Sequence, residues 1–403
     1  MTATASHPAP HDAPPRDEPP IRVLYLYPDT LGPQLQPERN ALYHLSRHFA
    51  GDFLAVWVCD PPEVDQVPAL SRALGRFEFD WLPWNRQDGP RKSFGDLRGM
   101  LARGRALARA RGGYDLIVAY GPYRVGVAGA ILKRLTGARL FLEFPGRPLP
   151  PPSLGGGRAS GVKRAIARRV VRAVARAADH WRLLYPTQLD DFPELAAQVP
   201  ARASVFHEFV PVHALGAMDH TPDPRPYLLF LGHPWRLKGV DVLIRAWQSL
   251  APVRGDWRLK IVGHCPDRAE WEALRAGDAS IEFHKGVLHE DAMRLVAASS
   301  GLVLPSRTEA MGRVLLEAMA MRKPVVATRV DGIPFYVTHE ETGLLCEAGD
   351  VDGLARQLRR VLTDRAFTDA MAARGQARVR EAYDEAVYVA RFHAMARRVL
   401  AGR

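Results

Sequence analysis

The sequence predicts an α/β protein made of two doubly wound, Rossmann-like domains. Short apolar runs alternate with helix-like segments along most of the chain, which is typical of parallel sheets covered by helices. A length of 403 residues is long for one domain and suits two. A segment rich in Pro and Asp, residues 219–226, divides the chain into two such halves. Hydrophobic residues make up 47% of the chain, enough for two sizeable cores.

The elements of each half follow in order. Residues 1–20 are rich in Pro, Ala, His and Asp without periodicity, which predicts a disordered tail. The first domain is expected over residues 21–212, the linker over 213–226 and the second domain over 227–383, with a C-terminal helix over 384–403. The predicted strands are 21–28, 54–61, 77–83, 114–121, 138–145 and 180–186 in the first half, and 227–232, 257–263, 281–286, 301–305, 324–330 and 342–345 in the second.

Two carboxylates, Glu309 and Glu317, stand eight positions apart across a predicted strand-to-helix junction. Glu309 falls in the loop beyond the strand, and Glu317 lies more than one turn into a helix that begins near Gly312. The first helical turn has free backbone N–H groups and the positive end of the helix dipole, so it is a favourable binding site for phosphate. The other interpretation is structural, with Glu309 as a capping carboxylate and Glu317 as a solvated helix residue. The loop and first turn also contain Ala310, Met311, Arg313 and Val314.

The residues that follow carry a family resemblance. The two glutamates lead into Glu317-Ala318-Met319-Ala320 and, after three more residues, into Pro324-Val325-Val326-Ala327-Thr328. This pattern resembles that of the family 4 glycosyltransferases, in which Glu, seven residues and a second Glu precede a Pro-Val-Val-Ala-Thr strand. The match is long enough to be specific.

A second block resembles the same family. The predicted strand 227–232 ends at Gly232, and a loop with His233, Arg236 and Lys238 then leads into a helix. In the family this loop carries an Arg directly after the Gly, and a Lys further on, that hold the donor diphosphate. Lys238 stands where that Lys belongs. His233 stands in place of the Arg and lacks its bidentate fork, so Arg236 is the candidate substitute.

The resemblance implies a GT-B fold, in which two Rossmann-like domains face each other across a cleft and a C-terminal helix crosses back to the first. It also implies a retaining transfer of a hexose-type sugar from a nucleotide diphosphate sugar to a glycan or lipid-linked acceptor, in the synthesis of a surface polysaccharide or glycolipid. Glu309, Lys238 and Arg236 are the expected catalytic residues, with Glu309 at the donor sugar and Glu317 at the ribose. Retention by same-face attack and retention through a covalent intermediate both stay open.

No catalytic metal or other cofactor is expected. The Asp350-Val351-Asp352 segment follows a Gly and is typical of a helix start rather than of a metal site. A GT-B protein that has lost catalysis and only binds a sugar nucleotide or a partner is the alternative function.

The first half departs from the family pattern. The loop after the first strand, Asp29 to Gln34, has a single Gly where many relatives have two. Tyr120 stands at the place of a His found near the donor sugar in many relatives, and a tyrosine with a pKa near 10 is a poor proton acceptor. Arg147 lies in a Pro/Gly-rich loop, residues 144–157, and is a candidate for an acceptor phosphate. A plain connecting loop is the other interpretation.

The net charge of +11 raises the question of an anionic partner. Between Glu143 and Asp179 the chain has no acidic residue, and one helix-like segment contains Lys163, Arg164, Arg168, Arg172 and Arg176. Helical spacing separates these arginines from an apolar side with Val162, Ile166, Val170 and Val174. An anionic membrane surface is the expected partner. A helix whose apolar side packs on the core is the alternative, and without interleaved aromatic residues no nucleic acid is expected.

The chain lacks the apolar stretch of a secretory signal and any run of membrane-spanning length. Its three cysteines are isolated, which argues against a disulfide framework or a zinc cluster. A cytoplasmic location is therefore expected, peripheral on the inner face of the plasma membrane.

Overall fold

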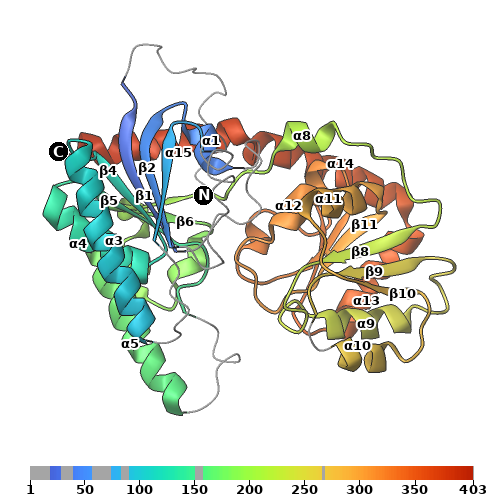
Figure 1. Ribbon diagram of the computed structural model, residues 1–403. Coiled ribbons are helices and arrows are strands. Elements are labelled where there is room, and N and C mark those ends of the chain that lie inside the picture. The colour runs from blue at the N-terminus through green and yellow to red at the C-terminus, as the bar shows by residue number, and fades with distance from the viewer. Residues whose placement is uncertain are drawn as a thin grey trace.

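The protein has two α/β domains, each with one parallel sheet between layers of helices (Figure 1). A computed structural model describes residues 19–28, 40–56, 74–82, 90–149, 158–265 and 268–402. Most of the predicted tail, the loop 29–34 and residues 150–157 of the Pro/Gly-rich loop lie outside these ranges.

The first sheet has seven strands in the order β3-β2-β1-β4-β5-β6-β7, and all of its strand pairs are parallel. Because the order runs outward in both directions from β1 and β4, the sheet is doubly wound. The strands are β1 Ile21–Tyr27, β2 Phe49–Val56, β3 Phe77–Leu82, β4 Leu116–Tyr120, β5 Arg139–Glu143, β6 His180–Leu183 and β7 Ala203–Val205.

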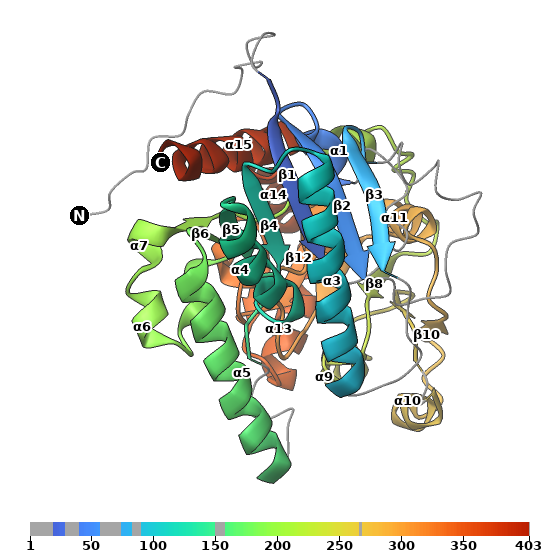
Figure 2. The ribbon, with the colours of Figure 1, turned by 60° about the vertical axis from the view of Figure 1, so that its left-hand side comes forward.

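Helices cover both faces of this sheet (Figure 2). The long helices α3, α4 and α5 pack on one face, where Leu24, Ile117 and Leu140 belong to one apolar core. The short α1 and the C-terminal α15 pack on the other, around Phe49 and Phe141. The helices are α1 Ala41–Leu45, α3 Pro90–Ala110, α4 Arg124–Thr136, α5 Arg158–Ala177, the 3-10 turn η4 Pro186–Leu189, α6 Pro193–Ala196, α7 Val199–Arg202 and α15 Glu385–Ala401.

The second sheet has six parallel strands in the order β10-β9-β8-β11-β12-β13. It repeats the doubly wound layout, with its switch point between β8 and β11. Its strands are β8 Tyr227–Leu231, β9 Arg258–Val262, β10 Ile281–His284, β11 Gly301–Leu304, β12 Val325–Thr328 and β13 Leu344–Cys346. Its helices are α9 Val240–Ser249, α10 Arg268–Arg275, α11 His289–Ala298, α12 Arg313–Ala320, η5 Ile333–Phe335, α13 Val351–Thr363 and α14 Arg365–Ala382, and α8 Val212–Gly216 precedes β8.

The chain crosses between the domains twice, before α8 and before α15. Helix α15 returns to the first domain, where Tyr388 and Phe392 are buried in the core beside Phe49. The buried Arg182 supports this return, because its guanidinium packs against both Phe206 and Tyr388, at 4.8 and 5.2 Å from their ring centroids. The predicted crossing of the C-terminal helix is therefore present.

Two strands differ from the prediction. Strand β2 begins at Phe49, five residues before the predicted start, because Ile21 pairs with Phe49 and the register with β1 then runs to Ala55. Strand β7 was not predicted. It has only three residues and forms one edge of the sheet, so it shows no apolar periodicity.

Candidate functional site

Two loops meet at the carboxyl ends of the neighbouring strands β8 and β11. Gly239, at φ +73°, lies so close to the other loop that an added Cβ would be 2.0 Å from the carbonyl oxygen of Pro305. Arg307 fastens the loops together, since its N–H donates to the carbonyl of Leu237 at 2.9 Å and its guanidinium forms two 2.7 Å bonds with Asp241. The site therefore lies at the topological switch point, where open α/β sheets bind ligands.

This contact brings Lys238 and Glu309 together, two residues that the family resemblance assigns to one donor site. The Lys238 Nζ donates to Oε2 of Glu309 at 2.5 Å, and the hydroxyl of Ser306 lies 3.3 Å from the same oxygen. Both side chains are largely shielded, with 18% and 12% of their surface exposed. A cation beside a carboxylate in such a place suits recognition of a ligand that carries both a negative group and hydroxyls.

A turn after β12 holds the backbone of Glu309 on both sides. The carboxylate of Asp331 accepts from the Glu309 N–H at 2.9 Å and from the Thr308 hydroxyl at 2.5 Å. The Gly332 N–H donates to the Glu309 carbonyl at 3.3 Å. Glu309 is thus fixed by its main chain, while its side chain is oriented by Lys238. Asp331 gave no signal in the sequence beyond its place after a predicted strand.

Helix α12 begins directly after this loop. Gly312 caps it at φ +60°, and an added Cβ there would lie 2.8 Å from the hydroxyl of Tyr336. The buried Tyr336 donates to the carbonyl of Met311, which fixes the stretch from Ala310 to the helix start. The N–H groups of Arg313 and Val314 belong to the first turn, where a helix offers donors without intrahelical partners.

Glu317 is buried on α12, with a residue exposure of 3%. Its Oε1 contacts the Nε2 of His289 at 3.0 Å and the Nε of Arg313 at 3.4 Å. It is therefore not a solvated helix residue, and its carboxylate is held between two nitrogen-bearing side chains. His289 is the first residue of α11, and nothing in the sequence pattern indicated its part in the site.

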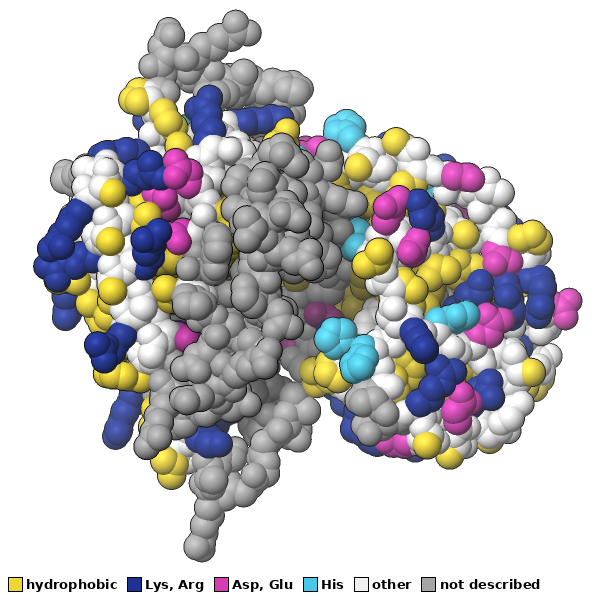
Figure 3. All heavy atoms as spheres, in the orientation of Figure 1, with side chains coloured by type: hydrophobic (Ala, Val, Ile, Leu, Met, Phe, Trp, Pro, Cys, Tyr) yellow, Lys and Arg dark blue, Asp and Glu magenta, His cyan; other side chains and the backbone are white. Residues whose placement is uncertain are grey.

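Arg236 and His233, two of the predicted donor-binding residues, are exposed. Arg236 is directed to Glu270 of α10, with its guanidinium 5.8 Å from the ring of Trp271, and its side chain is 64% exposed. Arg236 is therefore directed away from Glu309. The arginine that joins the two loops is Arg307. His233 follows Gly232 at the end of β8 and is exposed. Histidine side chains are visible on the side of the second domain that borders the first (Figure 3).

On the first domain, Tyr120 ends β4 and donates to Oε1 of Glu208 at 3.2 Å. Burial, and next the charge of Glu208, raise the pKa of Tyr120 well above its usual value, which disfavours its use as a base. Arg147 pairs with Asp191 at 3.2 Å and with Asp331 of the other domain at 3.1 Å. Its guanidinium is thus engaged by one carboxylate from each domain.

Helix α5 extends past the body of the first domain (Figure 2). The exposure of its apolar and basic faces differs from the prediction. Val162 and Ile166 are 64% and 55% exposed, and they belong to none of the apolar cores formed by the described residues. Arg164, Arg168 and Arg172 are instead half-buried against the segment after η4. Arg164 pairs with Asp191 at 3.7 Å, and Arg172 with Glu194 at 2.5 Å. From residue 161 onward, where the structure describes the side chains of the helix, the exposed cations are Lys163, Arg169 and Arg176.

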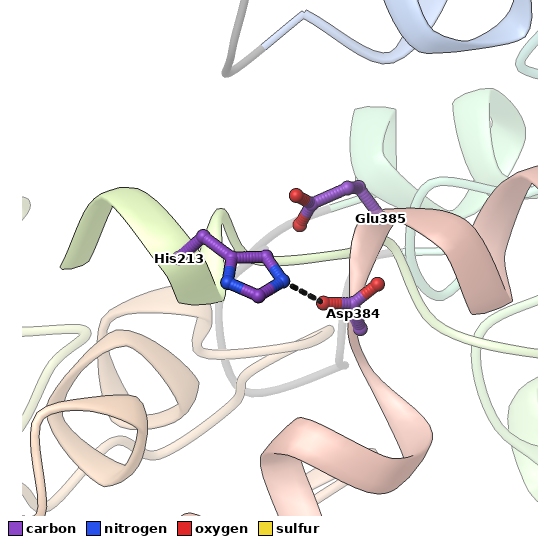
Figure 4. Close-up of side chains that lie close together, drawn as sticks. All are labelled: His213, Asp384 and Glu385. Atoms are coloured by element: carbon purple, nitrogen blue, oxygen red, sulfur yellow. Dashed lines mark ion pairs between the residues drawn. The ribbon is translucent and has the colours of Figure 1, made fainter. Parts of the chain in front are cut away.

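Among the described residues, one group of His and carboxylate side chains has ligand atoms within 4.8 Å of one another: His213, Asp384 and Glu385 (Figure 4). These residues lie where the chain crosses between the domains, on α8 and at the start of α15. Asp384 also caps α15 by accepting from the Ala386 N–H at 2.8 Å. Within the same described ranges, no helix is long and apolar enough to cross a membrane.

Residues 225–364 match the model of a family described as Glycosyl transferases group 1. Over 160 residues the chain is 37% identical to an N-acetyl-alpha-D-glucosaminyl L-malate synthase from Bacillus anthracis, covering 39% of this chain and 41% of the relative. The chain spans about two fifths of the length of the curated relatives it matches first. The family match covers the loops that contain Lys238 and Glu309.

Solved structures match nearly the whole chain. A sucrose-phosphate synthase from Thermosynechococcus elongatus has a TM-score of 0.74 at 19% identity, covering 94% of this chain and 100% of its own. The Anabaena protein HepE, solved in complex with UDP and glucose, has a TM-score of 0.68 at 20% identity, covering 93% and 98%. The chain therefore has the predicted GT-B fold.

Proposed function

We propose that the protein is a retaining glycosyltransferase that moves a hexose-type sugar from a nucleotide diphosphate sugar to a glycan or lipid-linked acceptor. The single observation that carries the proposal is the Lys238–Glu309 pair, held at the switch point of the second sheet beside the start of α12. The family match over residues 225–364 and the UDP and glucose bound by HepE support a nucleotide sugar as donor. Synthesis of a surface polysaccharide or glycolipid is the proposed setting.

The chemistry of such a transfer fits these residues. Breaking the anomeric C–O bond leaves a diphosphate, whose negative charge grows in the transition state and requires electrostatic stabilisation. Lys238 is the proposed cation for this charge, together with the N–H groups of Arg313 and Val314. Glu309 is the proposed partner of the sugar hydroxyls, and Glu317 of the ribose. Each of these groups is supplied by the protein, so the proposed reaction uses no metal.

Helix α5 is the proposed contact with an anionic membrane surface. Its projecting end presents Val162 and Ile166 beside Lys163, the combination with which an interfacial helix binds lipid headgroups. Arg169 and Arg176 extend the exposed charge along the helix. Arg164, Arg168 and Arg172 are occupied within the domain and are proposed to brace the helix instead.

A thermal-shift screen tests the donor assignment. Because a ligand that binds the folded state stabilises it by mass action, the correct nucleotide is expected to raise the unfolding temperature. The screen compares UDP, GDP, UDP-glucose and GDP-mannose, and one nucleoside class is expected to give a concentration-dependent shift. A following transfer or donor-hydrolysis assay separates the enzyme from a sugar-nucleotide-binding module. The absence of a shift with every ligand would contradict the proposed function.

A further inference from the structure

The two domains touch beside the loop that contains Glu309. Gly146, in the loop after β5, lies so close to the second domain that an added Cβ would be 3.2 Å from the Cβ of Ala310. Nearby, the rings of Tyr185 and Phe335 stack at a centroid distance of 5.9 Å. The segment that holds Glu309 is therefore in direct contact with loops of the first domain.

Arg147 is the charged link in this contact. Its Nη1 donates to Oδ1 of Asp331 at 3.1 Å, and its Nη2 donates to Oδ2 of Asp191 at 3.2 Å. The other oxygen of Asp331, Oδ2, accepts from the N–H of Glu309 at 2.9 Å. One planar guanidinium thus connects the first domain to the carboxylate that fixes the Glu309 backbone, a geometry that lysine does not reproduce.

The first-domain end of the link is firmly held. Gln188, 1% exposed, donates to the carbonyl oxygens of Phe144 and Gly146 at 2.8 and 2.7 Å and so fixes the loop that presents Arg147. Asp191 is braced from α5, because Arg168 donates to its carbonyl at 3.3 Å. Arg147 therefore projects from a supported base rather than from a free loop.

Asp331 depends on a cation at this place. Its side chain is only 7% exposed. A carboxylate this buried is costly without a paired charge. Arg147 supplies that charge and leaves Oδ2 free to hold Thr308 and Glu309.

We propose that Arg147 is a positioning residue for the donor sugar, which acts across the domain contact through Asp331 on Glu309 without touching the donor itself. This inference rests on the proposed function, in which Glu309 meets the sugar and Glu317 meets the ribose. Because the Arg147 link ends on the Glu309 segment and not on Glu317, its loss is expected to affect recognition of the sugar more than that of the nucleotide. A role confined to stability would affect both parts of the donor alike.

The test compares ligands with and without the sugar. Calorimetric titration of UDP and UDP-glucose, or of GDP and GDP-mannose where guanosine shifts the wild-type protein, is carried out on wild type and Arg147→Met. The variant is expected to bind the sugar nucleotide about tenfold more weakly and the nucleoside diphosphate within about twofold of wild type. Asp331→Asn is expected to show the same selective loss. Combining the two replacements is expected to add little, because both remove one interaction.

Arg254→Met is the matched control, since it breaks a two-bond pair with Asp278 at 2.8 and 2.9 Å within the second domain. It is expected to change neither affinity. Equal weakening of both ligands by Arg147→Met, or no weakening, overturns the positioning role while the proposed function stands. Wild-type protein that binds neither the nucleoside diphosphates nor the sugar nucleotides overturns the proposed function, and the positioning role falls with it.

Discussion

Replacing Glu309 by Gln is expected to lower the rate of sugar transfer by about 100-fold to 1,000-fold, the usual effect of removing one preorganised electrostatic group from an active site. The amide keeps the shape of the side chain but removes the charge that faces the sugar in the proposed complex. The replacement also ends the 2.5 Å ion pair with Lys238. Lys238 is then available to the diphosphate, so binding of the nucleoside diphosphate is expected to stay equal or become tighter.

This opposite behaviour of rate and nucleotide affinity distinguishes a catalytic carboxylate from a structural one. Rates are measured at saturating donor, and affinities by calorimetry on the same preparations. Glu270→Gln is a suitable control, because it removes an exposed carboxylate that pairs with Arg236 on the same domain. Glu309→Gln protein that transfers sugar within about twofold of wild type would contradict the catalytic assignment.

The sequence indicated which residues of the second domain lie together because its signals there are local. A short buried strand, a polar loop and a helix start at Gly312 put Glu309 and Glu317 on the same side of one sheet edge. Lys238 follows the neighbouring strand, and parallel strands bring their carboxyl ends to the same edge. The pairing of Lys238 with Glu309 is therefore a consequence of strand order, which the family resemblance supplied.

The sequence did not predict the direction in which the loop side chains point. Arg236 and Arg307 are both arginines in loops at this edge, yet Arg307 fastens the two loops and Arg236 turns outward to Glu270. The difference depends on α9 and α10, whose carboxylates Asp241 and Glu270 lie within reach only in the folded chain. Asp331 illustrates the same limit, because its three partners come from two domains.

Helix α5 is present as predicted, but three of its arginines, expected on the exposed face, are half-buried, and the first residues of its apolar face are exposed. Helical periodicity separates the apolar side from the arginines and does not indicate where the supporting domain ends. Val174 is buried as the pattern predicts, whereas Ile166, two turns earlier on the same side, is exposed. The acidic groups that engage the arginines, Asp191 and Glu194, follow a strand later in the chain.

Replacing Gly239 by Ala is expected to disrupt the site through the backbone alone. The new Cβ would lie 2.0 Å from the carbonyl oxygen and 3.0 Å from the carbonyl carbon of Pro305, and neither atom belongs to a side chain that can rotate away. The two loops must then separate, which breaks the bond from the Arg307 N–H to the Leu237 carbonyl and moves Lys238 from Glu309. A loss of about 3 kcal/mol or more in the free energy of unfolding is expected, with weaker nucleotide binding.

Gly255→Ala separates the steric clash from the cost of a left-handed backbone. Gly255 has φ +53°, close to the +73° of Gly239, but an added Cβ there meets nothing within 4 Å. This control is expected to lose only about 1 kcal/mol, the cost of placing a residue with a side chain in that region, and to bind nucleotide normally. Urea unfolding of both variants measures the difference. Equal losses in the two would show that the approach of Pro305 to Gly239 does not constrain the site.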